Sequence, residues 1–193
     1  MGLHSRRRTF INGNKPIEEL AKRDLQKYLS DLTKKQLSEQ IIDLYERFKD
    51  VKTFYDFAFN PQEDKLIDDF KTRVSKEYFP NTKRKAKMRR SVAQKLIKHF
   101  MTIELEPSLL LDAMLFNIEV AQAYTAEKLV KQEAFYKSIY NSFSQAANHA
   151  AYHGIFIDNF SRFESIVEDT AKQQWPNSDY FVEVINRYIK PNS

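Results

Sequence analysis

The chain has 193 residues, a length that suggests one domain or at most two closely packed ones. Hydrophobic residues make up 42%, which is enough for a real core and argues against wholesale disorder. Cysteine is absent, which excludes disulfides, zinc ribbons, iron–sulfur clusters and thiol nucleophiles. The net charge is +5, and residues 78–103 hold eight basic and no acidic residues, so this window supplies more than the whole positive balance.

The chain is predicted to be helical because it has few glycines and because its prolines lie where helices are expected to begin or end. Strand-rich folds recruit glycine at tight turns, and only three glycines occur here. The prolines fall where helical apolar spacing begins or stops, and Pro16 is expected to open the first helix. The sequence Thr33-Lys-Lys-Gln36 has the form of a capping box, which predicts the start of a second helix.

A short aromatic helix is expected over 51–59, followed by a helix that carries Leu66 to Tyr78 and stops before Pro80. We expect the rings of the short helix to lie in the core, with only Tyr55 considered for exposure, and they are Phe54, Tyr55, Phe57 and Phe59. Residues 81–90 form a basic connector. Ser91 is expected to cap the next helix.

The second half of the chain predicts four more helices. Pro107 begins a helix that is apolar nearly all round to Ala123, a pattern typical of a buried central helix. A longer helix over 126–153 is expected to close at Gly154 in a left-handed cap. A second capping box is expected over 161–164, and the last helix over about 178–189.

These elements predict an all-α, compact single-domain bundle of about eight or nine helices, with a buried central helix near 107–123. The domain is expected to span 16–193, and residues 1–15 to be a flexible basic arm or an added segment. No apolar stretch is long enough for a signal peptide or for a helix that spans a membrane. A cytoplasmic protein that does not bind membranes is therefore expected.

Four stretches give the chain a resemblance to a known family. They are QIIDLYERFKDVKTFYDFAFNPQEDKL, SKEYFP, KRKAKMRRSVAQKLIKHF and LLLDAMLFNIEVAQAY. From about Lys22 to His153 the chain resembles an uncharacterised bacterial family of small basic helical proteins, known only as a domain of unknown function. The resemblance implies a helical fold, no established activity and no catalytic residue.

The basic window 83–98 is the strongest candidate for a binding site. Several cations at close spacing, with no acid between them, suit phosphate contacts that release counterions, and the start of the following helix adds backbone N–H groups. The alternative is a solvated loop whose charges pair with acids elsewhere in the fold. The expected contacts to a polyanion are Lys83, Arg84, Lys85, Lys87, Arg89, Arg90, Lys95 and Lys98, which Arg6, Arg7 and Arg8 of the arm are expected to reinforce.

A histidine pair is a second candidate. His149 and His153 are four residues apart, so both rings lie on one helical face and supply half of a metal site. The third ligands considered are Glu119 and Asp158. The zincin motif would need glutamate directly after the first histidine, where Ala150 stands. The alternative is a pair of partly buried or capping histidines at a helix end, and no metal is assigned.

Two carboxylates on the apolar helix, Asp112 and Glu119, lie two turns apart on nearly the same face. They could support acid–base or metal chemistry, but the Glu-x-x-His pattern of di-metal bundles is absent. A structural role is favoured, with hydrogen bonds or an ion pair to a basic residue of a neighbouring helix, for which the basic window is one source.

The sequence therefore predicts a non-enzymatic binding module that contacts nucleic acid or another polyanion without a cofactor. Nucleophile elbows, phosphate-binding glycine loops and dinucleotide fingerprints are all missing, which weighs against common enzyme classes. One alternative is a protein-interaction or scaffold protein that binds an acidic partner or itself. Another is a metal-dependent hydrolase that uses His149 and His153.

Overall fold

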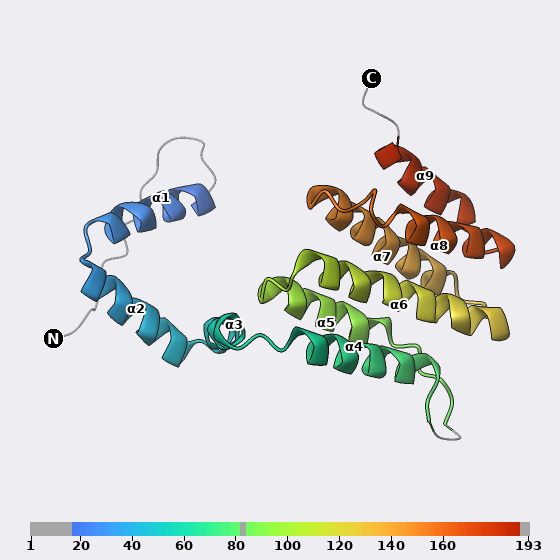
Figure 1. Ribbon diagram of the computed structural model, residues 1–193, viewed down its shortest axis with the longest axis horizontal. Coiled ribbons are helices and arrows are strands. Elements are labelled where there is room, and N and C mark those ends of the chain that lie inside the picture. The colour runs from blue at the N-terminus through green and yellow to red at the C-terminus, as the bar shows by residue number, and fades with distance from the viewer. Residues whose placement is uncertain (1–16, 82–83, 190–193) are drawn as a thin grey trace. The chain divides into compact units, whose positions relative to one another are not determined.

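The computed structural model describes residues 17–81 and 84–189, which form nine α-helices and no β-strand (Figure 1). The helices are α1 (Ile17–Ser30), α2 (Lys34–Arg47), α3 (Lys49–Phe59), α4 (Glu63–Tyr78), α5 (Arg90–Thr102), α6 (Pro107–Glu127), α7 (Glu133–Tyr152), α8 (Phe160–Lys172) and α9 (Ser178–Ile189). The all-α fold class is confirmed. Within these residues no helix is both long enough and apolar enough to cross a bilayer.

The contacts divide the chain into two units, and the boundary between Lys52 and Thr53 falls inside α3. The first unit contains α1 and α2, and the second contains the bundle α4–α9. A single domain over 16–193 stays a prediction. The expected arm, residues 1–15, lies outside the described residues.

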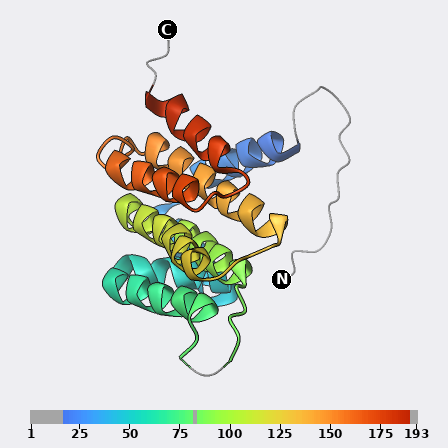
Figure 2. The ribbon, with the colours of Figure 1, turned by 90° about the vertical axis from the view of Figure 1, so that its right-hand side faces the viewer.

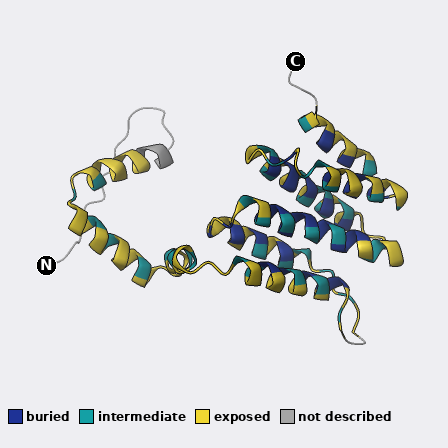
Figure 3. Cartoon of the chain, viewed as in Figure 1, coloured by how far each residue is buried: buried dark blue, intermediate teal, exposed yellow. Residues whose placement is uncertain are grey.

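In the first unit, the capping box that the sequence predicts is present at the start of α2. The Gln36 backbone N–H donates to the Thr33 hydroxyl, and the Thr33 backbone N–H donates to the Gln36 side-chain oxygen. The helix nevertheless buries no residue, and the apolar side chains of α1 and α2 are largely exposed (Figure 3). Local sequence therefore specifies the start of α2, while packing contributes little to its stability.

The expectation of a buried aromatic α3 is wrong. No residue of α3 is buried, and the Phe59 side chain is 84% exposed. Tyr55 and Phe59 stack on each other with ring centroids 6.1 Å apart, and only Phe57 packs against the core of the second unit. The rings of α3 therefore pack mainly against one another. The spacing of apolar residues in a sequence does not distinguish such local packing from burial in a core.

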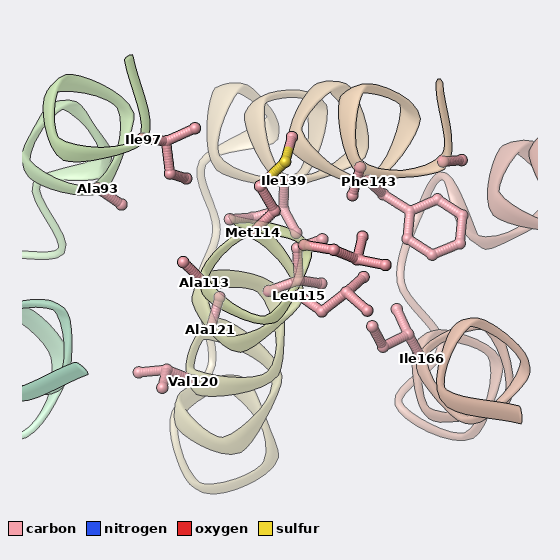
Figure 4. Packing of buried hydrophobic residues seen from close by; sticks show 14 of the residues in the cluster. Ala93, Ile97, Ala113, Met114, Leu115, Val120, Ala121, Ile139, Phe143 and Ile166 are labelled. Carbon is pink, nitrogen blue, oxygen red and sulfur yellow. The ribbon is translucent and has the colours of Figure 1, made fainter. Parts of the chain in front are cut away.

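In the second unit, α6 is the central helix, as the sequence predicts. It contacts α4 and α5 on one side and α7 and α8 on the other (Figure 1, Figure 2). Its buried side chains point in several directions, because a helix with neighbours on all sides needs no polar face. Figure 4 shows Leu115 of α6 beside Ile166 of α8, and Met114 of α6 beside Ile139 of α7.

Buried and half-buried polar groups connect α6 to α8 and to the segment that follows it. The Gln122 side chain is buried, and its amide N–H donates to the Ile166 backbone carbonyl at 2.7 Å. The Gln173 side-chain oxygen accepts hydrogen bonds from the Thr125 hydroxyl and from the Trp175 indole N–H. Each bond satisfies a group that would otherwise lose its hydration without compensation.

Three predicted helix boundaries differ from the structure. The long helix predicted over 126–153 begins later, at Glu133, because α6 continues to Glu127 and the chain then extends and buries Val130 before α7 begins. The capping box over 161–164 is also absent: α8 begins at Phe160, and the preceding Asn159 uses its side-chain amide to bond the Ile155 carbonyl. Ser91 does not cap α5, which begins one residue earlier, at Arg90.

The predicted left-handed cap at Gly154 is confirmed. Its φ is +71°, and the Ile155 backbone N–H donates to the Ala150 carbonyl at 2.9 Å, which satisfies the end of α7. Glycine adopts this conformation without the steric cost that a Cβ atom would impose.

Candidate polyanion-binding segment

The basic connector joins α4 to α5, and a single residue of α4 fixes its end. The Lys87 and Met88 backbone N–H groups both donate to the Glu77 carbonyl, at 3.0 and 2.9 Å. The Glu77 side chain accepts hydrogen bonds from the Arg89 guanidinium at 2.9 and 2.7 Å. Glu77 therefore holds three consecutive connector residues through its backbone and its carboxylate.

The two partners of the ion pair between Glu77 and Arg89 differ in exposure. The Glu77 side chain is 11% exposed, whereas the Arg89 side chain is 56% exposed. The hydrogen bonds from Arg89 lower the pKa of Glu77 below its ordinary 4.5, against the opposing effect of burial. The alternative interpretation of the basic window, a solvated loop, required acids elsewhere in the fold to pair with its charges. Glu77 is such an acid. Among the predicted contacts, Arg89 therefore already has an acidic partner.

Met88 adopts a left-handed backbone conformation, with φ of +48°. This conformation costs a residue with a Cβ atom roughly 1–2 kcal/mol. The two hydrogen bonds to the Glu77 carbonyl and the packing of the Met88 side chain against the core offset that cost. The turn directs the neighbouring basic side chains outward while its apolar residue points inward.

The other predicted contacts carry no ion pair to any acid in the described part of the chain. Arg84, Lys85 and Lys87 are exposed, Arg90 is half-buried, and Lys95 and Lys98 are exposed on α5. Lys83 and the Arg6–Arg8 run lie outside the described residues. Among the described cations of the window, Arg89 is therefore the one in an ion pair, while Lys87 adds a weaker electrostatic attraction to Glu77.

The structure does not gather these cations into one cluster. Arg84 and Lys85 line a cleft at the end of α6. Lys98 lines a different cleft, of about 620 Å³, between α5 and α7. The other residues that line the first cleft were not expected from the sequence, and they include Phe79, Tyr124 and Lys128. No sequence signal connects Phe79 to the distant end of α6, because only tertiary packing brings them together.

The carboxylates Asp112 and Glu119 have the structural role that the sequence favours, but with different partners. Arg162 of α8 donates to Glu119 at 2.5 and 2.8 Å and to Asp112 at 2.8 Å. Lys71 of α4 contacts Asp112 at 2.8 Å. The suggestion that the basic window supplies the partner is wrong. Burial raises the pKa of Asp112, but the hydrogen bonds from Lys71 and Arg162 outweigh this effect and lower it below 3.8.

The two histidines lie close together at the end of α7, with ring centroids 4.5 Å apart, and His153 caps the helix. The His149 Nε2 atom lies 2.9 Å from the Pro107 carbonyl, which can only accept, so this nitrogen carries the proton. Burial lowers the pKa of His149. Among the described residues no three His, Cys, Asp or Glu side chains are placed to hold a metal, and Glu119 is bound to Arg162.

Comparison with known proteins assigns a family but no activity. A family model described as a family of unknown function (DUF6155) matches residues 20–189. This span includes the segment after Gly154, which the resemblance based on sequence stretches left out. Neither the curated proteins nor the solved structures contain a match to the chain. The chain belongs to the family of unknown function DUF6155.

Proposed function

We propose that the protein is a non-enzymatic module that binds nucleic acid or another polyanion through its basic connector. The proposal rests on one observation. Three connector cations are exposed and form no ion pair with a described acid: Arg84, Lys85 and Lys87. Lys87 is also held at its backbone by Glu77. Cations that are exposed and positioned in this way release counterions when they contact phosphates, which favours binding at low salt.

The proposal predicts that neutralising these three cations weakens binding. The variant Arg84→Gln/Lys85→Gln/Lys87→Gln is expected to bind a labelled oligonucleotide about tenfold more weakly at low salt. The slope of log K against log salt is expected to fall by roughly 0.7–0.9 for each phosphate that the variant no longer neutralises. Fluorescence anisotropy between about 50 and 200 mM salt measures both quantities, with heparin as a second polyanion.

A matched control separates local from overall charge. Lys65→Gln/Lys137→Gln/Arg187→Gln removes the same charge from exposed positions elsewhere in the second unit. This variant is expected to keep the affinity and the salt slope of the wild type. Equal reductions in both variants, or no salt-dependent binding by the wild type, would refute the proposal.

A second candidate function is self-association, and the exposed apolar residues of the first unit favour it. Leu25, Tyr28, Ile41, Ile42 and Leu44 are all more than 40% exposed. Isolated helices of this length are marginal in water, so such faces need a partner. Residues 17–52 hold eight basic and eight acidic residues, so two copies of this unit meet without net repulsion.

The self-association candidate predicts a dimer that weakens when the apolar face of α2 becomes polar. Ile41→Gln/Leu44→Gln is expected to shift the protein to monomer in sedimentation velocity measured over a range of concentrations. Glu39→Gln/Glu46→Gln, on the opposite face of the same helix, is expected to leave the dimer intact. A wild-type monomer at every concentration would eliminate this candidate.

A further inference from the structure

A cleft of about 730 Å³ opens where the end of α4, the first residues of the connector and the end of α6 meet. Its volume falls within the range of small-molecule sites, roughly 300–1,000 Å³. The wall contains aromatic rings, cations and hydrogen-bond acceptors together. That combination restricts the chemistry of a ligand more than the connector charges do by themselves.

The aromatic part of the wall is rigid and partly open. The Phe79 ring packs edge-on against Tyr124 with centroids 5.9 Å apart, and Tyr124 in turn contacts Tyr78 at 5.8 Å. Phe79 is 39% exposed although it lies directly after α4. A ring fixed by its neighbours and open to solvent in a cleft is suited to stacking on a planar group.

The charged part of the wall comes from two elements. Arg84 and Lys85 of the connector and Lys128 after α6 are exposed cations, and Glu127 is the one acid of the lining. The carbonyl ends of α4 and α6 border the same cleft and carry partial negative charge. A bare phosphate would meet these acceptors as well as the cations, whereas a ligand with both phosphate and N–H groups satisfies both.

One buried polar group at this cleft lacks a partner. Tyr78 lines the cleft and is 3% exposed, and its hydroxyl makes no hydrogen bond within the described residues. Burial raises the pKa of Tyr78 to about 12, so the hydroxyl keeps its proton at neutral pH and remains a potential donor. The hydroxyl oxygen is itself buried, so it is not among the groups that a ligand in the cleft contacts directly.

We propose that this cleft binds an unpaired nucleotide of a single-stranded nucleic acid. The base stacks on Phe79 beside Tyr124, and its amino groups face Glu127 and the helix-end carbonyls. The flanking phosphates contact Arg84, Lys85 and Lys128. The inference rests on the proposed function and narrows it, because bases in an intact duplex are stacked inside and cannot reach these rings.

The test compares three labelled probes of one length: a single strand, the duplex of the same sequence, and an abasic strand that keeps only sugars and phosphates. The wild type is expected to bind the single strand at least tenfold more tightly than the abasic strand. Phe79→Leu keeps an apolar side chain against Tyr124 but removes the ring. It is expected to abolish this preference and to leave the salt slope unchanged.

Phe59→Leu is the matched control, because it removes a highly exposed phenylalanine ring on α3 and is expected to change nothing. Thermal unfolding and circular dichroism are the measurements that check whether both variants fold. Equal, salt-dependent binding of the single and abasic strands would overturn this inference and leave the proposed function standing. No binding of any strand or of heparin would overturn the proposed function itself. Displacement of the strand by an equal concentration of a nucleoside monophosphate would assign the cleft to free nucleotides and overturn the single-strand assignment.

Discussion

Replacing Phe143 with alanine is expected to lower the free energy of unfolding by about 3–5 kcal/mol. The side chain is completely buried and packs against Phe163 of α8 and Phe181 of α9, with ring centroids 5.6 and 4.8 Å apart. It therefore joins three helices, and its removal leaves a cavity that the surrounding rings cannot fill. Urea unfolding followed by circular dichroism measures the decrease in stability.

Leu129→Ala provides the control for this prediction. Leu129 is 83% exposed in the segment between α6 and α7, so its truncation is expected to change stability by less than about 0.5 kcal/mol. A Phe143→Ala variant within about 1 kcal/mol of the wild type would contradict the packing of α7, α8 and α9 described above.

Replacing Arg162 with methionine is expected to cost about 2–3 kcal/mol of stability at neutral pH. The change removes three charge-assisted hydrogen bonds and leaves Glu119 without a cation, while Asp112 keeps Lys71. The cost stays below that of a fully buried pair, because about a third of each carboxylate side chain is exposed and regains water.

Two variants show whether this cost comes from the uncompensated charge. Arg162→Met/Glu119→Met removes both partners and is expected to recover most of the stability. Lys172→Met breaks an exposed ion pair with Glu168 on the same helix and is expected to leave the stability nearly unchanged, because water solvates both exposed groups. A double variant that is no more stable than Arg162→Met would contradict this explanation.

The stability difference between the wild type and Arg162→Met is expected to depend on pH in a defined direction. Because the folded protein lowers the pKa of Asp112, its carboxylate stabilises the fold above the ordinary value of 3.8, and this contribution disappears as the pH falls through the folded pKa. The stability difference between the wild type and Arg162→Met is therefore expected to be largest near neutral pH and to narrow below about pH 4.

The helices were predictable because their signals are local. The spacing of apolar residues, Pro107, Gly154 and the Thr33 capping box each act within a few residues, and the structure confirms the helix starts and the cap that they predict. The boundaries that failed depend on distant partners. The helix is interrupted where Val130 packs into the core. No pattern within residues 126–153 indicates that this residue is buried there.

The candidate site was predictable only in part, for the same reason. A charge count locates the connector, but it cannot show that Glu77 accepts hydrogen bonds from Arg89, because the two residues meet only through the folding of the connector back onto α4. Likewise, Phe79 and Lys128 meet only through the contact between α4 and α6. The charges are visible in the sequence, and the structure shows which of them are already satisfied.

The attachment of the connector to Glu77 has an entropic consequence. Ordering one residue of a free loop costs about 1–2 kcal/mol, and a ligand that binds such a loop must supply that free energy. Hydrogen bonds to α4 already order Lys87, Met88 and Arg89 in the folded protein. A ligand that binds there therefore does not have to supply the free energy of ordering these residues. In the proposed binding function, an acidic residue thus contributes indirectly to the affinity for a polyanion, by preorganising the cations around it.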